Sequence, residues 1–227
     1  MEKKYWEWEP VFQLMPKDTA LLVVDMQKGF LDEGAPLEVP MARDQVSVLA
    51  GLISFCRRKK IPVVYSAFTI GPDFNYSFYW KMAEQRGLKV TNPDCAFWEG
   101  KTETDIAEAL RPLPGETVIK KCGYDCFART DLDHILRSMG IQTLLIAGTV
   151  VNWCVDSTVR GAYHRDYNVV VVSDAVSSFD HAGASAEDWC KMELNLFAEA
   201  FGRVLSAKEV MKELSGFDES NQSNQDV

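Results

Sequence analysis

The stretch 143–175, TLLIAGTVVNWCVDSTVRGAYHRDYNVVVVSDA, decides the fold of this chain. Two short apolar runs, 144–148 and 169–173, flank a segment with small and apolar residues at helical spacing. Apolar runs of this length, bounded by Gly and turn residues, are typical of parallel strands covered on both faces. The stretch therefore predicts a strand, a tight turn, a helix beginning near Cys154, and a second strand.

Cys154 lies at the predicted strand-to-helix turn, and Asn152 occupies the position of a helix N-cap. A thiol in the first turn is close to the positive end of the helix dipole, which lowers its pKa toward the reactive thiolate. The carboxyl edge of a parallel sheet is also where α/β folds place ligands and nucleophiles. The alternative is a buried structural cysteine, and this stretch alone leaves both interpretations open.

Length and composition favour an ordinary globular protein. The 227 residues fit one domain, with 47% hydrophobic, 25% charged and 11% aromatic residues. A net charge of -9 argues against nucleic acid or an anionic membrane as a partner. No apolar run approaches the roughly 20 residues that span a bilayer, and MEKKYWEWEP lacks the apolar core of a signal peptide. We expect a cytoplasmic protein with no membrane partner.

The six cysteines do not form the pattern of a disulfide framework. Cys122 and Cys126 are four residues apart, but no second pair or suitable histidine completes a zinc site. Among the three histidines, His164 is ten residues from Cys154 on the same predicted helix, which is too far for a hydrogen bond to its sulfur. We therefore expect no metal and no cofactor, and a general base other than histidine.

Strands alternate with helices along the rest of the chain. This order predicts an α/β fold: a doubly wound, mostly parallel sheet in a Rossmann-like three-layer sandwich that forms a single domain over 19–214. Residues 1–18 form an aromatic-rich arm that packs on the body or on a neighbouring subunit, and 215–227 a polar, disordered tail. The aromatic-rich segment 69–100 is a lid or a subunit interface. The expected strands are 20–25, 61–68, 116–121, 144–148, 169–173 and 204–205, and the expected helices are 44–60, 102–110, 131–139, 154–165, 186–201 and 207–214.

Three chemically useful residue types follow predicted strands. Asp25 ends the first strand, Lys120 and Lys121 end the third, and Cys154 follows the fourth. Carboxyl ends of parallel strands share one edge, so these side chains can converge. Asp25 can take the thiol proton, a lysine can favour the thiolate, and backbone N–H groups at Val150 and Cys154 can stabilise an oxyanion. Alternation allows only one of the two lysines to face the site, and Asp25 can alternatively form a turn or an N-cap.

The sequence resembles the isochorismatase-like cysteine hydrolases over about residues 18–205. Three motifs carry the resemblance, ALLVVDMQKGF at 20–30, VIKKCGYDCFARTDLD at 118–133 and AGTVVNWCVDSTVRGAYHRDYNVVVVSDA at 147–175. It implies a catalytic triad of Asp25, Lys121 and Cys154. Lys121 is preferred to Lys120 because the family's lysine lies three residues before the aromatic position that Tyr124 matches.

The resemblance also implies details around the triad. It implies a cis peptide between Thr149 and Val150, with the N–H groups of Val150 and Cys154 as the oxyanion hole. Pocket residues expected by position are Phe30, Tyr124, Phe127 and Trp153, each with core packing as the alternative.

Departures from family patterns narrow the expected substrate. No histidine precedes residue 134, which argues against the metal-binding nicotinamidase branch. Cys154 argues against the isochorismatases proper, which do not use the cysteine nucleophile. The resemblance is greatest to the branch of ureidoacrylate and N-carbamoylsarcosine amidohydrolases, so the expected substrate is a small amide, carbamoyl or ureido compound. Competing interpretations are a non-enzymatic or redox-sensing interaction protein and an isochorismate-type hydrolase. The aromatic arm and loop favour a homo-oligomer.

Overall fold

The centre of the protein is a six-stranded sheet with the order β3-β2-β1-β4-β5-β6, in which every neighbouring pair is parallel. The computed structural model describes residues 9–72, 81, 82, 84, 85 and 94–216. Every residue of the strands β1, β2 and β4 is buried, as their continuous apolar sequences require. The predicted parallel α/β sheet is confirmed. The strands are β1 (Thr19–Val24), β2 (Val63–Phe68), β3 (Thr117–Lys121), β4 (Thr143–Thr149), β5 (Asn168–Ser177) and β6 (Arg203–Leu205).

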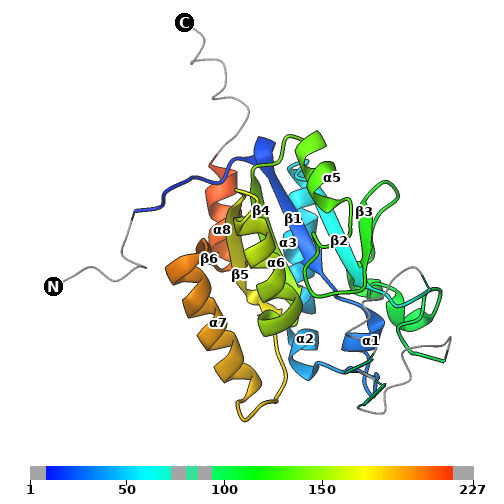
Figure 1. Cartoon of the computed structure of the whole chain (residues 1–227). Coiled ribbons are helices and arrows are strands. Elements are labelled where there is room, and N and C mark those ends of the chain that lie inside the picture. Colours follow the sequence, from blue (N-terminus) through cyan, green and yellow to red (C-terminus); the bar gives the residue numbers. More distant parts are fainter. Residues whose placement is uncertain (1–8, 73–80, 83, 86–93, 217–227) are drawn as a thin grey trace, which may run out of the picture.

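Helices cover both faces of the sheet and complete the three predicted layers (Figure 1). One core lies between the sheet and helices α3 and α8, and a second lies between the sheet and α5, α6 and α7. Two short helices, α1 and α2, follow β1. The bounds are α1 (Lys28–Leu31), α2 (Pro40–Asp44), α3 (Val46–Arg58), α5 (Leu132–Ser138), α6 (Asp156–Tyr163), α7 (Ala186–Ala200) and α8 (Ala207–Ser215).

The direction in which successive strands are added reverses between β1 and β4. The chain adds β2 and β3 on one side of β1, then returns to add β4, β5 and β6 on the other side. The connections that leave β1 and β4 therefore diverge to opposite faces and leave space between them. Such a switch point is where doubly wound folds bind their ligands.

Gly148 lets β4 approach β1 closely at this switch point. Its φ is 122°, and a Cβ atom there would lie 2.1 Å from the carbonyl oxygen of Val24. Val24 directly precedes Asp25, so the close approach brings the exits of the two strands together.

The N-terminal arm packs on the body where it is described. Leu14 is buried, and its N–H donates to Glu213 of α8 at 2.8 Å. The guanidinium of Arg203 lies 5.4 Å from the ring centre of Phe12. Residues 1–8 of the predicted arm and 217–227 of the predicted tail lie outside the described residues. No helix in the described ranges is long and apolar enough to cross a membrane.

The predicted helix over 102–110 is wrong. This segment forms two short 3-10 turns, η3 (Thr102–Thr104) and η4 (Glu108–Leu110), and Thr102 does not cap a helix. Tertiary contacts explain the difference, because the segment is bound to the exit of β1: the Gln27 side chain donates to the Thr104 carbonyl at 3.0 Å, and Lys28 N–H donates to the Asp105 carbonyl at 2.9 Å. These contacts outweigh local helix propensity.

Other elements differ from expectation mainly at their ends. The predicted helix over 44–60 is preceded by α2, which begins at Pro40. The strand predicted over 169–173 is longer, because β5 continues to Ser177 after an irregularity in its pairing with β4. The last predicted helix is confirmed as α8 and begins with a capping box formed by Ser206 and Glu209. The lid or interface role of 69–100 stays a prediction, since 73–80, 83 and 86–93 lie outside the described residues.

We predict that Gly148→Ala lowers the free energy of unfolding by about 3 kcal/mol or more, because the new methyl group meets a backbone carbonyl at a φ unfavourable to L residues. Urea unfolding measures the effect. The matched control is Gly51→Ala in α3, where nothing lies within 4 Å of the new Cβ. That change stabilises a helix by up to about 1 kcal/mol. Equal stability of the two variants would contradict the prediction.

Candidate active site

Asp25 leaves β1 in a fixed orientation at the switch point. The residue is fully buried, and its φ of 48° is unusual for a residue other than glycine. Its carboxylate is held at both oxygens: Ser66 Oγ donates to Oδ1 at 2.6 Å, and Lys121 Nζ forms an ion pair with Oδ2 at 2.6 Å. Strand β1 therefore delivers a buried carboxyl group whose two oxygens are held in place.

Lys121 ends β3 and extends to this carboxylate across the site. Three groups contact its ammonium: Nζ pairs with Asp25 Oδ2 at 2.6 Å and donates to the Gly123 carbonyl at 2.8 Å and to Cys154 Sγ at 3.3 Å. Its side chain is completely buried. Burial alone lowers the pKa of Lys121, but the charge of the Asp25 carboxylate, the largest of the opposing effects, raises it and the net shift is upward. Lys121 is therefore a permanent cation.

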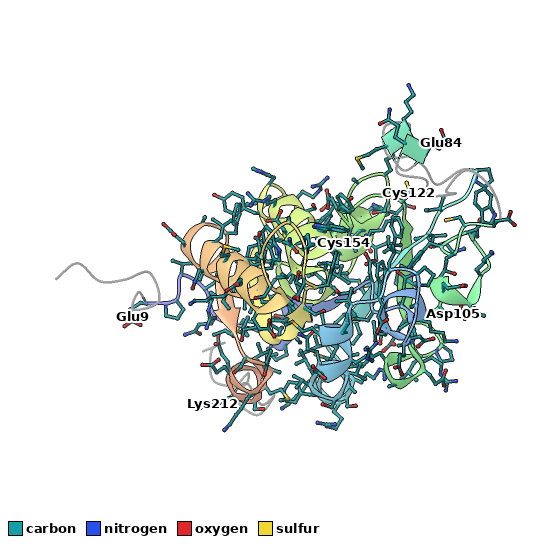
Figure 2. All side chains as sticks on the ribbon, turned by 90° about the horizontal axis from the view of Figure 1, so that it is seen from below. Glu9, Glu84, Asp105, Cys122, Cys154 and Lys212 are labelled. Atoms are coloured by element: carbon teal, nitrogen blue, oxygen red, sulfur yellow. The ribbon has the colours of Figure 1, made fainter. Side chains whose placement is uncertain are left out.

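Cys154 lies in the turn that follows β4. The turn begins after a cis peptide between Thr149 and Val150 and forms one π-helical segment, η5 (Val151–Val155), before α6. Cys154 is 5% exposed, and Figure 2, seen from below in the view of Figure 1, shows it in the interior of the molecule, whereas Glu9 and Lys212 lie at the periphery. The three side chains expected to meet do so through Lys121.

Two details predicted for Cys154 are wrong. Asn152 does not cap the helix, because its side chain bonds to Ser178 and His181 instead. The pKa of the Cys154 thiol is not lowered: burial raises it above the ordinary 9.0, the charge of Asp25 adds to this, and the opposing effect of Lys121 is smaller than that of burial. The cost of burying a charged thiolate raises the pKa by more than the positive end of the helix dipole lowers it. The resting group is a thiol beside a carboxylate.

The sequence did not single out several polar residues that order this site. Ser66 is a lone serine in the apolar strand β2, and Gln27 lies two residues after Asp25. The Gln27 side chain is fully buried, donates to the Phe68 carbonyl at 2.9 Å and accepts the Phe68 N–H at 2.7 Å. It thereby joins the exit of β1 to the end of β2. A polar residue inside a run that is otherwise continuously apolar was the available signal for Ser66.

The four expected pocket residues separate into two groups. Phe30 packs in the core with Phe68 and Phe97, and Phe127 stacks on Tyr167 with ring centres 5.8 Å apart. Tyr124 and Trp153 are 40% and 36% exposed, and their ring centres lie 5.8 Å apart. Tyr124 is adjacent to Gly123, which binds Lys121, and Trp153 is adjacent to Cys154. These two rings form an exposed aromatic surface, and each neighbours in sequence a residue that contacts Lys121.

His181 supports this aromatic surface from behind. Its ring stacks between Phe179 and Trp189, at centre distances of 4.3 and 5.1 Å, and meets Trp153 edge-on. Nδ1 lies 2.7 Å from the Phe179 carbonyl, so it carries the proton, and Nε2 lies 3.0 Å from the Asn152 side-chain amide. The loop after β5 thus fixes the turn that carries Cys154.

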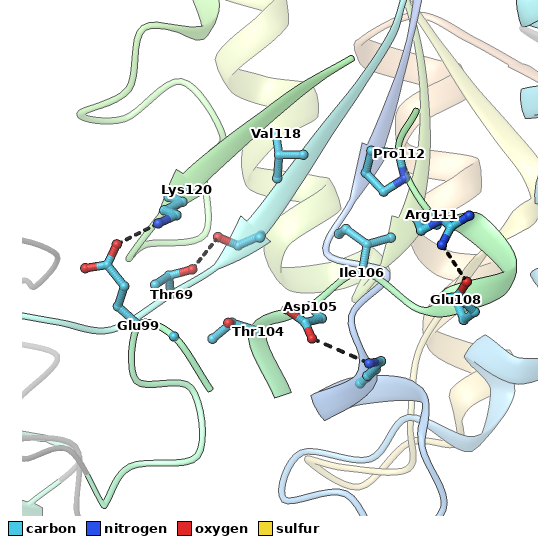
Figure 3. Close-up of a pocket in the computed structure, with 13 residues that line it drawn as sticks. Thr69, Glu99, Thr104, Asp105, Ile106, Glu108, Arg111, Pro112, Val118 and Lys120 are labelled. Carbon is cyan, nitrogen blue, oxygen red and sulfur yellow. Dashed lines mark hydrogen bonds and ion pairs between the residues drawn. The ribbon is translucent and has the colours of Figure 1, made fainter. Parts of the chain in front are cut away.

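The cavity in Figure 3 lies on the other side of β3 from this site and has a volume of about 460 Å³. Lys120 and Val118 line it, together with Thr69, Glu99 and Arg111. Lys120 Nζ pairs with Glu99 at 2.6 Å, on the surface. Alternation along β3 therefore directs Lys120 to this cavity and Lys121 to Asp25, which decides between the two lysines that the sequence left open.

The domain model of the isochorismatase family matches residues 19–209. This range contains every strand of the sheet and all three side chains that meet at the switch point. The chain belongs to the isochorismatase family. The resemblance inferred from the three motifs is thereby confirmed, as is the expectation of a hydrolase of this family.

Named relatives include an amidohydrolase. The chain is 32% identical to the ureidoacrylate amidohydrolase RutB of Pseudomonas syringae pv. syringae over 184 residues, which cover 74% of this chain and 73% of the relative. The corresponding enzyme of Agrobacterium fabrum is 29% identical over 182 residues, 74% of this chain and 78% of that protein. The expected branch of ureidoacrylate amidohydrolases thus includes relatives of this chain.

Solved structures agree with this isochorismatase-family assignment. A cysteine hydrolase from Pseudomonas syringae pv. phaseolicola has a TM-score of 0.82 and 30% identity, and the match covers 90% of this chain and 96% of the other. An N-carbamoylsarcosine amidase from Thermoplasma acidophilum has a TM-score of 0.66 and 28% identity, with 84% and 96% covered. In the described part of this chain, no three His, Cys, Asp or Glu side chains are grouped to hold a metal ion.

The raised pKa of Cys154 predicts that the resting protein holds no thiolate at this residue near neutral pH. A group whose pKa is raised keeps its proton up to and beyond the ordinary value of 9.0. The difference in absorbance at 240 nm between the protein and Cys154→Ser should therefore stay flat from about pH 5 to pH 9. A thiolate step centred near neutrality would contradict the structure.

We predict strong coupling between Asp25 and Lys121 in stability. Asp25→Asn or Lys121→Met alone leaves one buried charge without its partner and costs about 3–5 kcal/mol of unfolding free energy. The double variant leaves neither charge, so it should be more stable than the sum of the single effects by about 2 kcal/mol or more. Urea unfolding of the four proteins measures this coupling, and additive effects would contradict it.

Proposed function

We propose that this protein is a cysteine-dependent hydrolase of a small amide, carbamoyl or ureido compound, acting through a thioester with Asp25, Lys121 and Cys154 as its catalytic residues. One observation carries the proposal: a single buried ammonium contacts both a carboxylate at 2.6 Å and a thiol sulfur at 3.3 Å. This arrangement joins a proton acceptor, a cation and a nucleophile in a dry site.

The reaction would begin with proton transfer from the Cys154 thiol to Asp25 as the sulfur attacks the substrate carbonyl carbon. The carbonyl oxygen becomes an oxyanion, which the backbone N–H groups of Val150 and Cys154 would stabilise. Asp25 would then return the proton to the departing nitrogen, so that the C–N bond breaks and ammonia or an amine leaves. A thioester at Cys154 remains.

Hydrolysis of the thioester would reuse the same groups. Asp25, again a carboxylate, takes a proton from a water that attacks the thioester carbonyl, and the thiolate leaves and recovers that proton. Lys121 stays charged throughout and stabilises the negative charge as it moves between oxygen and sulfur. This role requires a cation that does not titrate near neutrality, in agreement with the upward pKa shift of Lys121.

Two observations favour a planar ureido or carbamoyl substrate. Relatives with about 30% identity carry the name ureidoacrylate amidohydrolase, and a structural neighbour is an N-carbamoylsarcosine amidase. Tyr124 and Trp153 are exposed, pack together and directly follow Gly123 or precede Cys154 in the chain, so they would be able to stack on a planar conjugated group of a substrate bound at Cys154. Ureidoacrylate-like compounds carry such a group.

Cys154→Ala is expected to lower turnover by about 10³-fold or more, because the nucleophile is lost. Ammonia release is measured over a panel of small amides, carbamoyl and ureido compounds, and the acyl adduct on Cys154 is sought by mass spectrometry after rapid acid quench. Cys190→Ala is the matched control, since this half-buried thiol lies in α7 and contacts Met41 rather than the triad.

Two outcomes would exclude the proposed reaction. Turnover by a folded Cys154→Ala protein at the wild-type rate would remove the cysteine from the mechanism. Pyruvate release from isochorismate, with no amide hydrolysed, would favour the isochorismate-type alternative.

A cytoplasmic location and a homo-oligomeric state also remain proposals. All six cysteines are free, which is typical of a protein in a reducing compartment. The exposed Tyr124 and Trp153 rings would be covered in part if a second copy packed over the mouth of the site.

A further inference from the structure

The four adjacent strands β3, β2, β1 and β4 each place one polar group at the same rim of the sheet. Lys121 ends β3, Asp25 follows β1 and Cys154 follows β4, and the proposed reaction uses all three. The strand between β3 and β1 is β2, and its polar residue on this face is Ser66. The proposed reaction gives Ser66 no role.

Ser66 contacts Asp25 at two points. Its hydroxyl donates to Asp25 Oδ1 at 2.6 Å, and the Asp25 N–H lies 3.2 Å from both the hydroxyl and the carbonyl oxygen of Ser66. Because the hydroxyl oxygen can accept from this N–H, its own proton is directed toward the carboxylate. The two residues are fully buried, so water does not compete for these bonds.

The hydrogen bond from Ser66 fixes the orientation of the Asp25 carboxylate, with Oδ1 toward Ser66 and Oδ2 toward Lys121. With Oδ1 bound to Ser66, the carboxylate cannot rotate about its Cβ–Cγ bond without losing a short hydrogen bond to a charged group, which is among the stronger hydrogen bonds in proteins. Oδ2 is thereby held against the Lys121 ammonium, which also contacts Cys154 Sγ. Without Ser66, Oδ1 would be a buried charged oxygen with one bond fewer, and the carboxylate would be free to turn.

Cys126 is the other side chain that competes for the Ser66 proton. This fully buried thiol lies beside Ser66 and Thr158; burial raises its pKa to about 11, and the hydroxyls of Ser66 and Thr158 lower it only in part. A neutral sulfur is a weak acceptor, so the proton goes to the carboxylate.

We propose that Ser66 is a positioning residue of this site, which orients Asp25 so that its carboxylate can take the Cys154 proton. The inference rests on the proposed function where it is tested by turnover. The test by thiol reactivity does not depend on the proposed function. Ser66 does not touch the substrate in this assignment and acts only through Asp25.

The test compares Ser66→Ala with Ser66→Thr, which keeps the hydroxyl on a residue type that suits a strand. Ser66→Ala should lower kcat about 10- to 100-fold with KM changed less than about twofold, because proton transfer is impaired and substrate binding is not. Ser66→Thr should restore most of the loss. Ser177→Ala is the matched control: this serine is equally buried, lies at the same sheet edge in β5, and has no side-chain partner within the described residues.

A second measurement needs no substrate. The rate at which iodoacetamide alkylates Cys154 at neutral pH, followed by peptide mass, depends on transfer of the thiol proton to Asp25. Ser66→Ala should slow alkylation about tenfold or more in the wild-type background and have no further effect in Asp25→Asn, since Ser66 acts through that carboxylate. Urea midpoints establish that each variant is folded.

Two results would overturn the inference. One is a folded Ser66→Ala protein with kcat and alkylation rate within about twofold of wild type. The other is an equal slowing of alkylation with and without the Asp25 carboxylate, which would make Ser66 a general packing residue. If wild-type protein hydrolyses no amide in the panel, the proposed function fails, and the alkylation measurements still decide the role of Ser66.

Discussion

The ammonium of Lys121 is the group on which the site depends. A buried ion with no access to water must be paired or hydrogen-bonded, and the three partners of the Lys121 ammonium come from the exit of β1, the loop after β3 and the turn after β4. Fixing one nitrogen atom therefore fixes three segments relative to one another. Because a buried ion pair is often no more stable than an apolar replacement, stability gives little reason to keep it, and chemistry gives a better one.

The topology makes this convergence possible. Strand order reverses between β1 and β4, so Asp25 and Cys154 leave neighbouring strands at the switch point, while Lys121 comes from the far side of β2. Strands β3 and β4 are not neighbours in the sheet, and the long side chain of Lys121 reaches from β3 to both Asp25 and Cys154. Ser66, on the strand in between, contacts the carboxylate directly. The strand order thus accounts for a short carboxylate at the end of β1, beside the cysteine turn, and a long lysine at the end of the more distant β3.

The residues at the ends of apolar runs could be predicted, and those governed by tertiary contacts could not. Asp25 and Cys154 each follow a run whose pattern indicates a buried strand, and Lys121 ends a shorter strand with alternating burial. The ends of parallel strands share one rim of the sheet, so the order of strands and helices is enough to place all three there. The segment 102–110 has the pattern of a helix, but its backbone binds Gln27 and Lys28. Asn152 has the position of an N-cap, but its partners lie in the loop after β5. The lowered pKa expected for Cys154 failed because desolvation, which depends on the whole fold, outweighs a helix end.

The state of Cys154 separates the enzymatic interpretation from the redox-sensing one. Oxidation-sensitive cysteines are exposed and hold a thiolate at neutral pH. Cys154 is 5% exposed, and its raised pKa keeps it protonated. In the proposed reaction a nucleophile is formed only when the thiol proton passes to Asp25 as a substrate carbonyl is attacked. A thiol of this kind is poorly reactive toward general oxidants and depends on the orientation of one carboxylate, which favours a hydrolase over a sensor on this fold.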